Sequence, residues 1–131
     1  LNFIQSVPVE PNTLPPAIDL EFSGNCQARP SKEEVQHEID VFAQLIKQRY
    51  GKTPIIYTTN DSYKAFLAGD DLGYPIWIRD IYSKPSLPDG AKWDFWQFTH
   101  QGRLHGIEGF VDLNVYNGSK EEFETFISSE K

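Results

Sequence analysis

Short apolar segments that alternate with helical segments restrict the fold of this chain more than any other feature. Five segments are apolar, β-branched or aromatic and have the length of strands: residues 17–22, 55–59, 75–79, 92–99 and 110–115. Helical segments lie between several of them, and parallel strands need such connections. The order of the elements therefore predicts a parallel α/β architecture.

Helix signals accompany these strands. Ser31 and Glu34 form the Ser-x-x-Glu pattern of a capping box, and Gly51 has the position of a stop signal. Apolar residues between them recur at helical spacing. The same pattern at Ser119 and Glu122 predicts a last helix. Shorter helical segments are predicted at 1–7 and 62–68.

The length of 131 residues is enough for one domain but not for a closed (β/α)₈ barrel, which takes about 250 residues. We therefore expect an open sheet or a partial barrel. The chain has no methionine and opens on a segment that looks like the end of a helix, so we expect it to be part of a longer protein. An open sheet exposes unpaired strand edges. We expect residues 17–22 to form an edge strand that self-associates or pairs with a missing amino-terminal segment.

The charge balance excludes two classes of partner. There are 12 Lys and Arg against 19 Asp and Glu, a net charge of −7, so a nucleic-acid backbone or an anionic membrane would repel this chain. No segment approaches the length of an apolar membrane span. The single cysteine, Cys26, excludes an internal disulfide, and we expect its thiol to be structural.

Two acidic residues, Asp19 and Glu21, lie in the most informative strand. The strand alternates apolar and acidic residues, so Ile18, Leu20 and Phe22 share one face and the two carboxylates share the other. Neighbouring carboxylates repel each other, and a strand tolerates them where they do chemistry. An acid-catalysed glycoside hydrolysis needs two carboxyl groups with different pKa values. The alternative is a solvent-facing edge strand, where acidic residues are common.

Several further residues lie on or near the carboxyl ends of the predicted strands, where active residues of parallel α/β folds cluster. They are Tyr57, Trp77, Trp96, Gln97, Asp112 and Asn114. Aromatic rings beside carboxylates suit a sugar, because its C–H faces stack on rings and its hydroxyls need polar partners. Each tryptophan taken alone has the alternative role of a core residue. Their joint arrangement favours a sugar site.

A metal site would need a histidine ligand beside the acidic pair. The three histidines, His37, His100 and His105, lack ligand-like spacing with that pair. A nucleophilic triad has no better support, because no serine lies in a nucleophile-elbow pattern. We therefore expect neither a metal nor a cofactor.

Five segments in order carry a family resemblance: Ala-Ile-Asp-Leu-Glu at 17–21, Pro-Ile-Ile-Tyr-Thr at 54–58, Pro-Ile-Trp-Ile at 75–78, Trp-Asp-Phe-Trp-Gln-Phe at 93–98 and the Gly-Ile-x-Gly-x-Val-Asp-Leu-Asn segment within 106–118. Together they resemble the lysozymes of glycoside hydrolase family 25, the N,O-diacetylmuramidases. The resemblance implies an irregular TIM-like β/α barrel, of which this chain covers roughly the last five strands. Residues 1–131 would then be the carboxyl-terminal part of a single catalytic domain.

The resemblance also implies a function. The expected reaction is hydrolysis of the β-1,4 bond between N-acetylmuramic acid and N-acetylglucosamine in peptidoglycan, by an enzyme that is secreted, periplasmic or phage-delivered. Glu21 matches the general acid, and Asp19 matches the residue that orients or stabilises the acetamido group of the substrate. Substrate-binding positions would be Asp112, Tyr57, Trp77, Trp96, Gln97 and Asn114. The alternative from the residues is a non-catalytic module that binds glycan without cutting it.

Two residues depart from the family pattern. Arg79 stands where many members have a small residue, and Ile81 stands where an aromatic residue is frequent. Arg79 and its neighbour Asp80 are candidates for a local ion pair.

Overall fold

The computed structural model describes residues 2–22 and 29–128, so Cys26 lies outside the described residues. In chain order the elements are α1 (Asn2–Ser6), β1 (Ala17–Leu20), α2 (Lys32–Tyr50), β2 (Ile55–Thr59), α3 (Asn60–Phe66), β3 (Ile76–Arg79), β4 (Phe95–Gly102), β5 (Val111–Tyr116) and α4 (Lys120–Ser128). None of the described helices is both long and apolar enough to cross a membrane.

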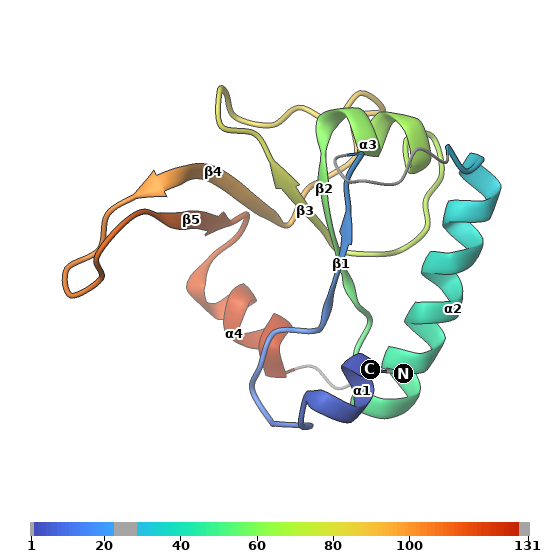
Figure 1. Cartoon of the computed structure of the whole chain (residues 1–131), viewed down its shortest axis with the longest axis horizontal. Helices are drawn as coiled ribbons and strands as arrows, with labels where there is room; N and C mark the ends of the chain where they lie inside the picture. The colour runs from blue at the N-terminus through green and yellow to red at the C-terminus, as the bar shows by residue number, and fades with distance from the viewer. Residues whose placement is uncertain (1, 23–28, 129–131) are drawn as a thin grey trace.

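The five strands form one sheet in the order β1-β2-β3-β4-β5 (Figure 1). The first four strands are mutually parallel, as predicted, and β1 is an edge strand. The last strand, β5, runs antiparallel to β4, so the parallel part of the sheet ends at β4. A parallel pair needs a crossover of a dozen or more residues, and the turn between β4 and β5 is too short for one. The sheet of the described residues is open, so the prediction of an unclosed α/β sheet is confirmed.

The long helix α2 begins and ends where the sequence predicts. The Glu34 amide donates to Oγ of Ser31 at 3.2 Å, and the Ser31 amide donates to Oε2 of Glu34 at 2.8 Å, which completes the capping box. Gly51 ends the helix with a φ of 68°, a conformation that glycine adopts without strain. Ser119 and Glu122 form the same reciprocal pair before α4.

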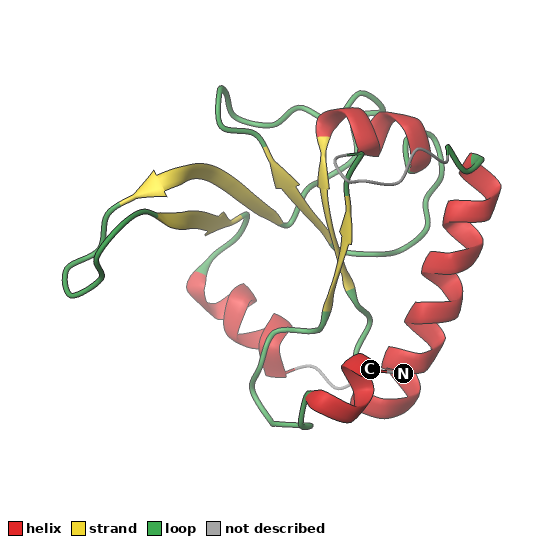
Figure 2. Cartoon of the chain, in the orientation of Figure 1, coloured by secondary structure: helices red, strands yellow, loops and turns green. Residues whose placement is uncertain are grey.

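Helices α2 and α3 cover one face of the sheet, which we call the covered face (Figure 2). Its strand residues include Ile56 and Ile78, both fully buried, and they pack against Ile39 of α2 and Phe66 of α3. We call the opposite side the open face. There α4 packs on the amino end of β4, where the rings of Phe126 and Phe95 lie 5.5 Å apart. The rest of the open face has no helix over it in the described part of the chain.

The hairpin of β4 and β5 extends away from the helices (Figure 2). Its pairing register shifts on both sides of Thr99, and Gly102 lies buried at the end of β4. A Cβ atom at Gly102 would lie 2.5 Å from Cγ of Leu113 and 2.9 Å from the carbonyl oxygen of Val111. The close approach of β5 therefore requires glycine at this position.

Candidate active site

The sheet register brings predicted site residues from separate strands onto the open face. Asp19 of β1 pairs with Tyr57 of β2, which pairs with Trp77 of β3. Trp77 pairs with Phe95 of β4, and two residues further along Gln97 of β4 pairs with Asn114 of β5. Paired residues of neighbouring strands point to the same side of a sheet, so these six side chains share the open face.

A hydrogen bond joins two of these side chains, Tyr57 and Gln97. The Tyr57 hydroxyl donates to Oε1 of Gln97 at 2.5 Å, and Gln97 is only 3% exposed. The Tyr57 ring meets the Trp77 ring edge to face, with 4.8 Å between their centroids. The half-buried aromatic pair therefore has a fixed orientation beside a buried amide.

A second hydrogen bond fixes the indole of Trp77. Its Nε1 donates to Oδ1 of Asn114 at 2.8 Å, which links β3 to β5 across β4. Below this bond, towards the amino ends of the parallel strands, lies a pocket lined mainly by apolar side chains that include Ile55 and Phe95. The polar groups of the open face therefore lie above an apolar floor.

Charged groups of both signs act on the Tyr57 hydroxyl. Burial raises the pKa of Tyr57 to about 12, and the negative charge of Glu21 contributes in the same direction. The charges of Asp19 and Asp112 also raise this pKa, whereas the positive charge of Arg79 lowers it. Three carboxylates and one guanidinium, carried on or next to β1, β3 and β5, therefore act on the Tyr57 hydroxyl.

Asp19 and Glu21 differ in their positions on the strand. Asp19 lies within β1, whereas Glu21 follows its last residue, Leu20. Burial and the charge of Glu21 both raise the pKa of Asp19. The two carboxylates are thus electrostatically coupled at the carboxyl end of a parallel strand, where α/β folds place chemistry.

The backbone before Glu21 has an anchor that sequence reasoning missed. The Thr58 hydroxyl donates to the Leu20 carbonyl at 2.9 Å, and Thr58 is fully buried. This bond fixes the carbonyl of the peptide unit that joins Leu20 to Glu21. The signal in the sequence was a hydroxyl at a core position of an apolar strand.

The prediction that Trp96 lies with the other predicted sugar-binding residues does not match its position. Trp96 pairs with Ile78, packs partly buried against the core of the covered face, and donates its Nε1 proton to the Asp80 carbonyl at 2.8 Å. Neighbouring residues of a strand point to opposite faces, so Trp96 cannot share a face with Gln97. Its role in the structure is packing and support of the loop after β3.

The expected pair of Arg79 and Asp80 does not form. The Asp80 carboxylate instead accepts hydrogen bonds from Nδ2 of Asn60 at 2.9 Å and from the amides of Tyr82 and Ser83 at 3.0 Å. Burial acts to raise the pKa of Asp80, but these hydrogen bonds outweigh it and hold the pKa below its usual value. Asp80 therefore orders the loop after β3.

No metal centre accompanies these residues in the described part of the chain. Among residues 2–22 and 29–128, no three His, Cys, Asp or Glu side chains are grouped so that they could hold a metal ion.

Two carboxylates beside aromatic rings and amides are the residue types that a glycosidase site uses. The family model of glycosyl hydrolases family 25 matches residues 1–107. This chain belongs to that family. Asp112 and Asn114 lie beyond the matched residues.

Individual relatives agree with this assignment. The chain is similar to a family 25 glycosyl hydrolase structure from Bacillus anthracis, with a TM-score of 0.86 and 41% identity over 95% of this chain and 59% of that one. It is 34% identical to the protein YegX of Escherichia coli over 98% of this chain and 46% of the relative. It is 32% identical to Lysozyme M1 of Streptomyces globisporus over 82% of this chain and 39% of the relative. The chain thus spans about half the length of these curated relatives.

Proposed function

We propose that this chain carries the carboxylate pair and part of the sugar-binding surface of a peptidoglycan muramidase. The reaction is hydrolysis of the β-1,4 bond between N-acetylmuramic acid and N-acetylglucosamine. One observation carries the proposal: in a family 25 chain, Asp19 and Glu21 are coupled carboxylates at the carboxyl end of β1. The relatives named lysozyme and glycosyl hydrolase support the class of reaction.

In the proposed mechanism Glu21 is the general acid. Its carboxyl group donates a proton to the glycosidic oxygen as the bond from that oxygen to the anomeric carbon breaks. The sugar that carries this anomeric carbon also carries an acetamido group, whose oxygen attacks the carbon and forms an oxazolinium ion. This substrate-assisted route exists among glycosidases. Asp19 stabilises the positive charge of the ion. Water then attacks the anomeric carbon, the bond from that carbon to the acetamido oxygen breaks, and the water returns a proton to Glu21.

The remaining open-face residues bind the sugars. The edges and faces of Tyr57 and Trp77 contact the apolar side of a ring, while Gln97, Asn114 and Asp112 offer partners to hydroxyl and amide groups. The hydrogen bonds of Tyr57 and Trp77 keep this surface in one geometry before the substrate arrives. No step of the mechanism requires a cofactor.

We further propose that residues 1–131 act as the carboxyl-terminal part of a single catalytic domain. The β1 edge and the open face would meet the remaining strands of a barrel, or a second copy of this chain. The similarity over 59% of the Bacillus anthracis structure supports this arrangement. Its substrate is in the cell wall, which the protein would reach by secretion, in the periplasm or by phage delivery.

Digestion of purified peptidoglycan tests the reaction. This chain and a longer polypeptide that contains it are each incubated with peptidoglycan, and the reducing ends of the products are identified by mass spectrometry. The expected products end in N-acetylmuramic acid. Glycan binding without products from either polypeptide would favour the alternative, a non-catalytic glycan-binding module.

A pair of variants tests the general acid. Glu21→Gln is expected to abolish product formation without unfolding the protein, because an amide cannot donate the required proton. Glu10→Gln makes the same change of charge at an exposed residue before β1 and is expected to leave activity unchanged. Retained lysis by Glu21→Gln would remove Glu21 from the mechanism.

A further inference from the structure

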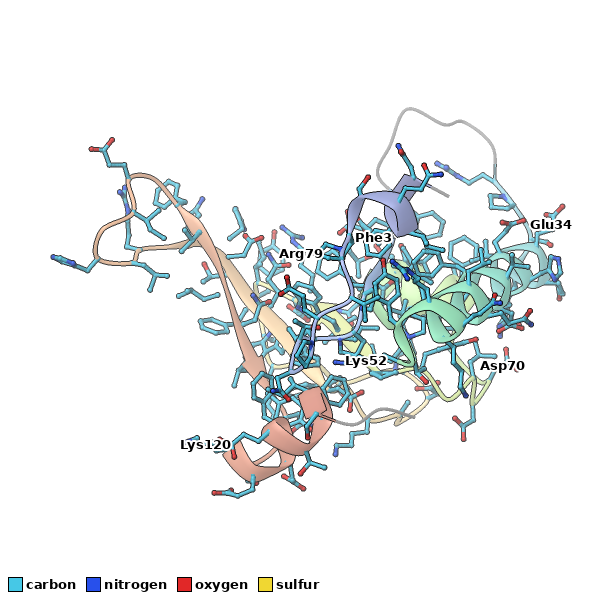
Figure 3. The ribbon with its side chains drawn as sticks, turned by 90° about the horizontal axis from the view of Figure 1, so that it is seen from below. Phe3, Glu34, Lys52, Asp70, Arg79 and Lys120 are labelled. Carbon is cyan, nitrogen blue, oxygen red and sulfur yellow. The ribbon has the colours of Figure 1, made fainter. Side chains whose placement is uncertain are left out.

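Arg79 is the last residue of β3 and lies on the open face. It pairs with Thr59 of β2 and with Gln97 of β4. The register puts its side chain on the same side of the sheet as Gln97, whose Oε1 accepts the proton of Tyr57. Arg79 is half-buried, and Figure 3 shows it between the β4–β5 hairpin and α2.

The guanidinium of Arg79 has no anionic partner in the described part of the chain. The two ion pairs found there join Lys32 to Asp70 and Lys120 to Glu124. Asp80, the nearest carboxylate in the sequence, is turned to the loop by its own hydrogen bonds. An arginine is always charged and carries five donors, so a half-buried one is stabilised by any anion that fits its planar fork.

The surroundings of Arg79 explain why such a cation matters. Asp19, Glu21 and Asp112 act on the same region and would repel an acidic substrate. Arg79 is the basic group that offsets them there. Because the carboxylates repel an anionic substituent of the glycan and the guanidinium attracts it, that substituent can bind only beside Arg79. The position of Arg79 therefore orients the chain of sugars.

We propose that Arg79 forms an anion subsite on the open face that binds a carboxylate of the acidic glycan substrate. The inference rests on the proposed function, because it names the part of peptidoglycan that this face recognises. N-acetylmuramic acid differs from N-acetylglucosamine by its lactyl ether, which ends in a carboxyl group, and attached peptides carry further carboxylates. A guanidinium fork that binds such a carboxylate distinguishes the two sugars of the strand.

Binding of two matched ligands tests the subsite. The first is the peptide-free disaccharide with N-acetylmuramic acid at its reducing end, which lacks the bond proposed to be cut. The second is its lactyl methyl ester. We expect the wild-type chain to bind the free acid about tenfold more tightly, by titration calorimetry or NMR, since a charged hydrogen bond is lost in the ester. Arg79→Gln should bind both ligands with the affinity of the ester.

Two further variants make the result specific. Arg79→Lys keeps the charge but not the fork, so it should retain only part of the preference. Arg49→Gln makes the same change of charge on the exposed side of α2 and should keep the full preference. A peptide-bearing disaccharide distinguishes the source of the carboxylate, because a preference that appears only with this ligand assigns the subsite to the peptide.

Three results would overturn the inference. Equal binding of every acidic ligand and its ester by the wild-type chain would remove the subsite while leaving the proposed reaction intact. A preference that survives in a folded Arg79→Gln variant would assign it to another residue. If no glycan binds, the inference and the proposed sugar site both fail. The affinity ratio is read without turnover, so selective binding without cleavage by this chain or by the longer polypeptide would sustain the subsite and refute only the reaction.

Discussion

The hydroxyl of Tyr57 on β2 donates a 2.5 Å hydrogen bond to Oε1 of Gln97 on β4, and so bridges two strands that are not adjacent. The intervening strand, β3, carries Trp77, whose indole bridges to Asn114 on β5. The two bridges interlock across the open face. The positions of the candidate site side chains therefore depend on the arrangement of the four strands that carry them.

Breaking the first bridge should reduce stability. Tyr57→Phe leaves Oε1 of the buried Gln97 without its donor, which is expected to cost about 1–3 kcal/mol in the free energy of unfolding. Gln97→Leu and the double variant complete a mutant cycle, measured by urea unfolding. We expect a coupling energy of about 1 kcal/mol. Simple additivity of the two single changes would show that the bridge has no energetic role.

The raised pKa of Tyr57 predicts a loss of stability in alkali. Its pKa is about 12 in the folded protein, against 10.0 ordinarily, so the unfolded chain loses this proton first. The stabilising contribution is therefore fully present below pH 10.0 and is lost as the pH rises towards about 12. Between these pH limits, the free energy of unfolding should fall more steeply with pH for the wild type than for Tyr57→Phe. Parallel curves would contradict the raised pKa.

The coupling of Asp19 to Glu21 predicts a change in titration. Removing the neighbouring charge in Glu21→Gln should lower the pKa of Asp19 but leave it above its ordinary value, because burial is the larger cause. NMR titration of the side-chain carboxyl carbon measures this, with Glu10→Gln as the control. The raised pKa favours folding only while Asp19 is protonated, so this contribution is lost as the pH rises through its folded pKa. An unchanged Asp19 titration in Glu21→Gln would show that the carboxylates are independent.

Gly102 predicts a steric effect in the hairpin. Gly102→Ala places a methyl group against Leu113 and the Val111 carbonyl, which is expected to cost about 1–3 kcal/mol. Gly102→Ala with Leu113→Ala should recover part of this loss relative to Leu113→Ala alone, because the nearest side-chain atoms are then gone. Urea unfolding measures all four proteins. A Gly102→Ala variant as stable as the wild type would mean that the strands separate easily.

The open edge of β1 predicts association. Unpaired strand groups and an uncovered face favour contact with a second copy when no other segment covers them. We expect light scattering on this chain to show a mass that rises with concentration. A monodisperse monomer at every concentration tested would refute the prediction.

Sequence rules succeeded where the cause was local. The capping boxes at Ser31 and Ser119 depend on residues three positions apart, and both formed. The direction of β5 depends instead on the length of a turn within the sheet. The face of Trp96 follows from a register that only the paired strands define, although the alternation with Gln97 was visible in the sequence.

The candidate site shows the same division. The order of motifs indicated Asp19, Glu21 and Tyr57 together, because a parallel sheet aligns the ends of its strands. The partners of these groups were not predictable. Asp80 was expected to bind Arg79, but loop amides that lie only two and three residues ahead satisfied it instead. Because the loop amides bind the Asp80 carboxylate, the guanidinium of Arg79 remains available on the open face.

The hydrogen bond from the Thr58 hydroxyl to the Leu20 carbonyl limits the residues that position 58 can accept. Valine would fill the same buried volume but leave the carbonyl without its donor. Serine would keep the donor but leave a void the size of a methyl group. Threonine satisfies both demands. The packing of the interior and the position of the peptide unit before Glu21, the proposed acid, therefore both depend on one buried side chain.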